Sequence, residues 1–238
     1  MVMFNSQTKW LVAGLLAVSG CAMAPHAGSE LVSQLDVQDS AKPAELSPAV
    51  ASNACVATAK ALAKNGYETD AIAEYEHARE LNPEVTGISR YLAVLYGRQH
   101  NRQKALTEFQ LALKEHPKDA DLLNDFGYFH LEQEEWSLAE TQLNKALTLA
   151  PKHERARINL GLALAYQGRV EESLAAFKPA IGEAAAHSNL AMILAQQGKA
   201  DAARREFQRA AELDATLQQP QVALAILDRE TEVGTATP

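Results

Sequence analysis

The sequence is poor in aromatic residues and has no excess of basic side chains. Aromatic residues make up 6% of its 238 residues, whereas alanine is frequent. Alanine-rich, aromatic-poor chains suit closely packed helices better than sheets. The formal net charge of -8 argues against a general nucleic-acid binder, which needs a basic footprint. These absences favour an all-α protein that does not bind nucleic acid.

Catalytic and metal-binding motifs are also missing from the sequence. It contains no H-E-x-x-H, no G-x-S-x-G, no phosphate-binding loop and no dinucleotide glycine pattern. Its seven histidines are scattered, and no pair has metal-ligand spacing with a third ligand nearby. We therefore predict a protein that is not an enzyme and has no metal ion or cofactor.

The N-terminal segment has the pattern of an export signal. Lys9 precedes the apolar run 10–18, which has the length of a signal h-region but is too short for a membrane span of roughly 20 residues. The run leads into Val18-Ser19-Gly20-Cys21. These small residues before a cysteine resemble the bacterial lipobox. The alternative is an ordinary secretory signal with a cysteine that is there by chance.

The lipobox resemblance implies that residues 1–20 are a signal peptide and that Cys21 carries the lipid anchor. Ala22 follows this cysteine, where an aspartate would suggest retention at the inner membrane. The resemblance thus implies a lipid-anchored protein of the bacterial outer membrane, facing the periplasm. Residues 21–51 hold three prolines and one glycine among polar residues. This composition predicts a flexible tether with a root-mean-square span of about 30 Å.

From residue 52 onward the sequence repeats itself with a period of 34 residues, a length typical of a repeat architecture. Each repeat carries a small residue, a second one 12 positions later and a third after 7 more. A proline closes the first three repeats, at Pro83, Pro117 and Pro151. The small positions are Ala59, Ala71, Ala78, Ala93, Ala105, Ala112, Gly127, Ala139, Ala146, Gly161, Ser173, Ala180, Ala191, Ala203 and Ala210. A bulky position, mostly aromatic, holds Tyr75, Phe109, Leu143, Phe177 and Phe207.

This pattern resembles the tetratricopeptide repeat (TPR). The resemblance implies an all-α, right-handed superhelical solenoid of about five helical hairpins with a C-terminal capping helix. We expect a TPR domain at 52–230 and a disordered tail at 231–238. The expected repeats are 52–85, 86–119, 120–153, 154–183 and 184–217. The expected helices are 52–64, 68–80, 86–99, 102–115, 120–133, 136–148, 154–167, 170–180, 184–197, 200–213 and 217–229.

The fourth repeat departs from the pattern. It lacks the closing proline, carries Pro179 within its second helix and is four residues short. Its second helix is therefore expected to end early. This irregularity either is a harmless deletion or bends the array.

In the TPR family the first helix of each hairpin lines a ligand groove through its positions 2, 5, 6, 9, 12 and 13. Carried onto this sequence, the resemblance implies peptide contacts from Lys60, Lys64, Arg90, Arg98, Asn124, Asp125, Tyr128, Arg155, Asn159, Tyr166 and Asn189. Asn159 and Asn189 resemble the asparagines that hold a peptide backbone in some TPR proteins, although asparagine is also common here as a local helix contact. Four basic residues in the first two repeats suggest an acidic partner segment.

The sequence thus predicts a scaffold that binds protein or peptide segments. Its signal, tether and repeats resemble the TadD family of lipoproteins that assemble the tight-adherence (Flp) pilus and, less closely, the lipoprotein that assembles the type IV pilus secretin. The alternative function is that of a periplasmic adaptor that docks peptidoglycan-modifying enzymes.

Overall fold

The structure, a computed structural model, describes residues 46–235. Within this range the chain is helical throughout, with short connections and no strand. The helices are α1 (Pro48–Lys64), α2 (Glu68–Leu81), α3 (Ser89–Arg98), α4 (Arg102–Glu115), α5 (Ala120–Glu132), α6 (Trp136–Leu149), α7 (Glu154–Tyr166), α8 (Val170–Ile181), α9 (Glu183–Gln196), α10 (Ala200–Leu213) and α11 (Gln218–Thr235). None of these helices is long and apolar enough to cross a membrane. The expected signal peptide, Cys21 and most of the expected tether lie outside the described residues.

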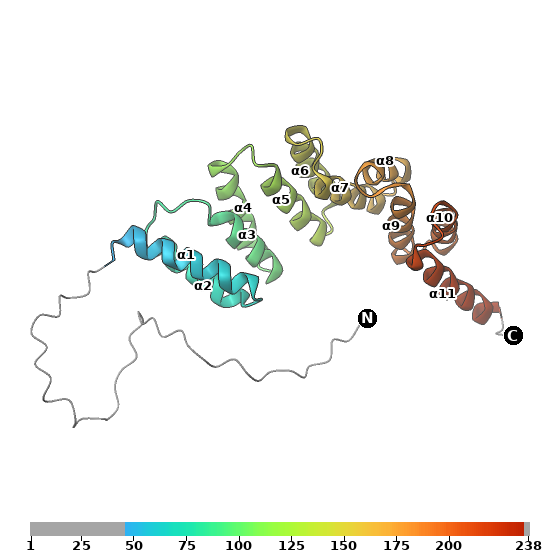
Figure 1. Cartoon of the computed structure of the whole chain (residues 1–238), viewed down its shortest axis with the longest axis horizontal. Helices are drawn as coiled ribbons and strands as arrows, with labels where there is room; N and C mark the ends of the chain where they lie inside the picture. The colour runs from blue at the N-terminus through green and yellow to red at the C-terminus, as the bar shows by residue number, and fades with distance from the viewer. Residues whose placement is uncertain (1–45, 236–238) are drawn as a thin grey trace, which may run out of the picture. The chain divides into compact units, whose positions relative to one another are not determined.

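The first ten helices form five hairpins (Figure 1). Each odd-numbered helix packs on the helix that follows it, as α1 does on α2 and α9 on α10. The first helices of successive hairpins also contact one another, α3 with α5, α5 with α7, and α7 with α9. The expected all-α array of five hairpins is therefore confirmed, and α11 packs on α10 at its end.

The small residues of the repeat lie where helices touch. Ala59, Ala105, Ala146 and Ala203, for example, are completely buried, because a small side chain lets neighbouring helices approach closely. The bulky side chains at the aromatic position fill the space between the helices and are at most 2% exposed. One position differs from the expectation: Ala180 is only half-buried, since α8 ends one residue later.

One residue with a positive φ angle forms the tight turn within each hairpin. Gly66, Gly168 and Gly198 have positive φ angles of 83°, 78° and 75°, the left-handed conformation that glycine adopts without strain. These glycines form the turns of the first, fourth and fifth repeats. In the second and third repeats His100 and Glu134 take the same conformation, each with a φ of 57°, which non-glycine residues seldom adopt.

The closing prolines lie just beyond the second helices. Asn82, His116 and Ala150 are the C-caps of α2, α4 and α6, and a proline follows each of them. Proline excludes the helical conformation at the residue before it and cannot continue the hydrogen-bond ladder. The predicted ends of these helices are confirmed to within one residue.

Three other helix bounds differ from the expected ones by more than one residue. Helix α1 begins at Pro48 rather than 52, because Ser47 caps it by accepting a hydrogen bond from the Val50 amide, so the tether predicted to end at 51 was too long. Helix α3 begins at Ser89 rather than 86, because Gly87 has a φ of 76°. Helix α11 continues to Thr235, so a disordered tail from 231 was wrong for residues 231–235.

The short fourth repeat ends as predicted. Helix α8 has 12 residues, whereas α6 and α10 have 14. Gly182, with a φ of 83°, caps the end of α8 and the start of α9 at once. Because the fourth repeat is four residues shorter, only Gly182 separates α8 from α9, where the other repeats have a longer loop.

Candidate binding groove

A groove runs along the first helices of the second, third and fourth repeats. It consists of three adjoining pockets of about 360, 260 and 190 Å³. Val94, Arg98 and Asp125 line both the first and the central pocket, and Tyr128 and Arg155 line both the central and the third. The pockets are therefore continuous across α3, α5 and α7.

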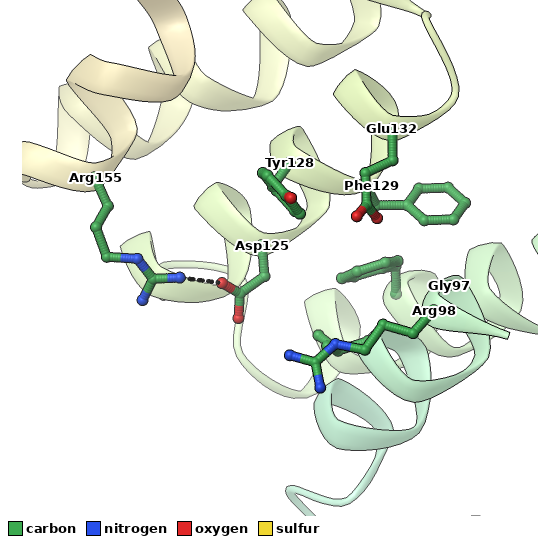
Figure 2. Close-up of a pocket in the computed structure, with 9 residues that line it drawn as sticks. Gly97, Arg98, Asp125, Tyr128, Phe129, Glu132 and Arg155 are labelled. Atoms are coloured by element: carbon green, nitrogen blue, oxygen red, sulfur yellow. Dashed lines mark hydrogen bonds and ion pairs between the residues drawn. The ribbon is translucent and has the colours of Figure 1, made fainter. Parts of the chain in front are cut away.

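The central pocket combines an apolar floor with charged walls (Figure 2). Phe109 and Phe129 line the pocket together with Val94 and Gly97, and both rings are almost fully buried. The charged residues are Arg98, Asp125, Glu132 and Arg155. Such a site can bind both the apolar and the charged parts of a ligand.

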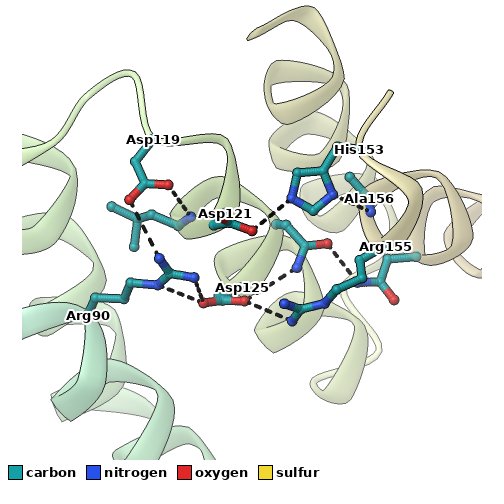
Figure 3. A network of polar contacts seen from close by, with 10 residues as sticks. Arg90, Asp119, Asp121, Asp125, His153, Arg155 and Ala156 are labelled. Atoms are coloured by element: carbon teal, nitrogen blue, oxygen red, sulfur yellow. Dashed lines mark hydrogen bonds and ion pairs between the residues drawn. The ribbon is translucent and has the colours of Figure 1, made fainter. Parts of the chain in front are cut away.

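Asp125 is the centre of a polar network that joins three repeats (Figure 3). Its Oδ2 accepts hydrogen bonds from Nε and Nη2 of Arg90 at 2.8 and 2.6 Å. Its Oδ1 accepts one from Nη2 of Arg155 at 3.3 Å. The Arg90 guanidinium also lies 3.5 Å from Asp119. Arg90 was expected to contact a ligand, but these partners also give it an internal role, because two charge-assisted hydrogen bonds to one half-buried carboxylate oxygen fix the position of α3 relative to α5.

Asn124 was expected in the groove, but it is completely buried. Its amide nitrogen donates to Asp125 and its oxygen accepts a hydrogen bond from Asn159 at 2.9 Å. A ligand cannot reach Asn124, which instead satisfies two polar neighbours inside the protein. Asn159 remains partly exposed and lines the third pocket.

The remaining basic residues of the first two repeats are not an open cationic patch. Arg98 donates to Glu68 at 3.0 Å, and the Lys60 ammonium lies 5.2 Å from the centre of the Tyr91 ring. Lys64 is exposed. The sequence predicted that these basic residues attract an acidic partner. It gave no indication that Glu68 pairs with Arg98 or that Asp125 pairs with Arg90, because each acid comes from a different helix.

Tyr128 projects into the groove with 47% of its surface exposed. Partial burial raises the pKa of its hydroxyl, and the nearby Glu132 carboxylate raises it further. The phenol therefore stays protonated over the physiological range and can donate a hydrogen bond.

Tyr166 and Asn189 also lie outside the three pockets. Tyr166 stacks on Trp136 with ring centres 4.3 Å apart and donates to Gln196 at 2.6 Å, so it connects neighbouring repeats. Asn189 is half-buried on α9. The structure therefore brings Arg90, Arg98, Asp125, Tyr128, Arg155 and Asn159 together, and leaves Lys60, Lys64, Tyr166 and Asn189 beyond the pockets.

Nine groove residues were not among the predicted contacts. They are Ala63, Tyr91, Val94, Leu95, Gly97, Phe109, Phe129, Glu132 and Ile158. Six of them, all but Leu95, Phe109 and Phe129, occupy the ligand-facing repeat positions of the family, so the register contained the signal for them. In the described part of the chain no group of histidine, cysteine and acidic side chains could hold a metal ion.

Comparison with known proteins assigns the repeats to a family. Profiles described as tetratricopeptide repeat match residues 92–154, 124–188 and 184–217, which together cover more than half of the chain. The chain belongs to the tetratricopeptide-repeat family. TPR proteins serve as scaffolds that bind peptides or other proteins, and this is the coarse function that the family supports.

Solved structures share this TPR fold. The structure titled "Functional Characterization of Pseudomonas Aeruginosa pilF" has a TM-score of 0.57 and 21% identity, over 76% of this chain and 85% of that one. YrrB, titled "a TPR protein with an unusual peptide-binding site", has a TM-score of 0.54 and 23% identity over 71% and 89%. A structure titled "MamA AMB-1" has a TM-score of 0.55 and 22% identity over 70% and 93%. At these identities the similarity establishes the fold alone.

Proposed function

We propose that this TPR protein is a lipid-anchored envelope scaffold whose groove across α3, α5 and α7 binds an extended segment of a partner protein. The continuity of the three pockets along the first helices is the observation that carries the proposal. An extended peptide advances about 3.3 Å per residue, so a groove over three helices 8–10 Å apart can contact several residues in a row. YrrB, which shares the fold, is described as having a peptide-binding site.

The envelope location rests on the sequence before the described residues. Val18-Ser19-Gly20-Cys21 after a short apolar run supports export and acylation at Cys21. Acyl chains that each bury many methylenes, at about 0.8 kcal/mol per methylene, would hold the protein on the membrane. Labelled palmitate should enter the wild type and not Cys21→Ser, and equal labelling of both would contradict the anchor.

The resemblance to pilus assembly lipoproteins supports a role in Flp or type IV pilus biogenesis or secretion. A pull-down from envelope extract can test this role together with the groove. We expect Tyr128→Ala to lose the partner and Leu138→Ala to retain it, because Leu138 has a matching exposure of 48% but lies on α6 outside the groove.

The identity of the captured protein decides the process. Recovery of pilus assembly components that depends on Tyr128 would support the proposal. Recovery of a peptidoglycan-modifying enzyme would replace the pilus role by that of a cell-wall adaptor. Equal capture by both variants would mean that the groove is not the binding surface.

A further inference from the structure

The size and lining of the central pocket restrict what it can accept. Its volume of about 260 Å³ is below the roughly 300–1,000 Å³ of sites that enclose a small-molecule ligand. Phe109, Phe129 and Val94 make one side of it apolar. The pocket is therefore suited to a single large apolar side chain that projects from a longer ligand.

Gly97 keeps this pocket open. A Cβ atom added at Gly97 would lie 3.1 Å from Cδ2 of Phe129 and 3.5 Å from its Cε2. A larger residue at this position would fill the space next to the Phe129 ring. The absence of a side chain here leaves the Phe129 ring, which is 3% exposed, as the wall of the pocket beside Gly97.

Arg155 is a cation at the rim with only a weak internal partner. Its side chain is 67% exposed and makes one 3.3 Å contact with Asp125. Asp125 is already paired with Arg90 at 2.6 Å, so it keeps a partner when Arg155 moves away. Exposed ion pairs contribute little to stability, so a ligand carboxylate can replace Asp125 on Arg155 at little cost.

Arg98 is a second cation that can exchange its internal partner for a ligand carboxylate. It lines both pockets that Asp125 lines, and its pair with Glu68 at 3.0 Å is exposed. At the other end of the central pocket Glu132 follows Asp125 by seven residues, about 10 Å along the helix. A ligand carboxylate is therefore attracted at the Arg155 end and repelled at the Glu132 end, which orients the segment.

We propose that the partner segment carries a large apolar or aromatic side chain, which enters the central pocket, next to an Asp or Glu, which binds Arg155 with help from Arg98. This inference rests on the proposed peptide-binding function and adds the chemistry that the groove selects. The occupant is a segment of a protein, since an isolated carboxylate would leave the apolar floor unused.

A library of random 12-residue peptides displayed on phage tests this proposal on the purified full chain. Selected peptides should be enriched in an aromatic or large aliphatic residue beside Asp or Glu. A synthetic peptide of the selected sequence should lose about tenfold in affinity when its acid is replaced by the amide, as expected for a charge-assisted hydrogen bond.

Two variants and one control assign this selectivity to the pocket. Arg155→Gln should remove the preference for the acid over the amide peptide, whereas Arg205→Gln, an exposed arginine on α10, should keep it. Val94→Trp, checked for folding by its thermal melt, should abolish binding of the apolar residue. If Val94→Trp does not fold, Arg155→Gln still decides the charge preference.

The outcomes separate this proposal from the proposed function. Peptides that require the groove but show no apolar–acidic pair would overturn the proposed chemistry and leave peptide binding intact. Unchanged acid preference in Arg155→Gln would also overturn it. If neither Val94→Trp nor Tyr128→Ala weakens the binding of any selected peptide, the groove is not the peptide-binding site.

Discussion

At the residue scale, two small residues in the fourth repeat show how tightly the hairpins are packed. A Cβ atom on Gly161 would lie 2.6 Å from ring atoms of Phe177, which is completely buried. Ser173, the one hydroxyl among the small positions, donates to the Gly161 carbonyl at 2.8 Å. Gly161 is therefore required for space, and Ser173 is tolerated because its hydroxyl has a partner.

Gly161→Ala should destabilise the protein, because the added methyl group overpacks the hairpin. Overpacking costs about 1–3 kcal/mol, which exceeds or offsets the gain of about 1 kcal/mol in helix propensity. Gly97→Ala is the matched control, since its added Cβ comes no closer than 3.1 Å to Phe129. Chemical denaturation should find Gly161→Ala clearly less stable than Gly97→Ala, and equal stability of the two would contradict the packing.

Residue-scale prediction was weakest for the polar groups of the groove. Asp125, Tyr128, Arg155 and Asn159, which the register indicated, line its pockets. The register could not show that Asn124 is buried. Adjacent residues of a helix point in different directions, so one can face the groove while its neighbour faces the interior. Nor could the register show that Arg90 is bound by Asp125, a residue 35 positions away.

At the element scale, the small positions determine how closely helices pack. Ala105 on α4 and Ala146 on α6 are both completely buried. Ala105→Leu and Ala146→Leu should each cost about 1–3 kcal/mol, because a larger side chain there separates the helices. Ala175→Leu, at an exposed position on α8, is the control, and thermal melts that place all three variants together would contradict the repeat register.

Most helices could be predicted because the 34-residue period repeats the same packing constraints. The bounds that differed depend on local details outside that period: the Ser47 cap of α1, the left-handed Gly87 before α3, and the length of α11. The turns at His100 and Glu134 were also unforeseen, since the sequence there lacks the glycine that marks the other turns.

At the scale of the whole array, α11 covers the last hairpin. Ala223, Leu224 and Leu227 pack against the apolar cluster that includes Leu190 and Phe207. Terminal repeats need such a cover because their outer apolar face has no following repeat. The cap therefore belongs to the folded domain.

Removing the cap should destabilise the C-terminal hairpin. A chain ending at 217 should lose about 2–4 kcal/mol from the exposure of apolar surface and should aggregate more readily. A chain ending at 229 is the control, because it retains Leu224 and Leu227. Equal denaturation midpoints and equal solubility for the two truncations would mean that α11 is not a cap.

The proposed function requires that a partner segment lies in the groove across α3, α5 and α7. Photo-crosslinking in living cells tests it most directly, with a benzophenone amino acid placed at Tyr128 in the groove or at Leu138 on α6, whose exposures of 47% and 48% match. We predict a discrete crosslinked partner from position 128, located in one short segment of that partner by mass spectrometry, and none from position 138. Crosslinks from position 138 alone, or the same adducts from both positions, would contradict the claim.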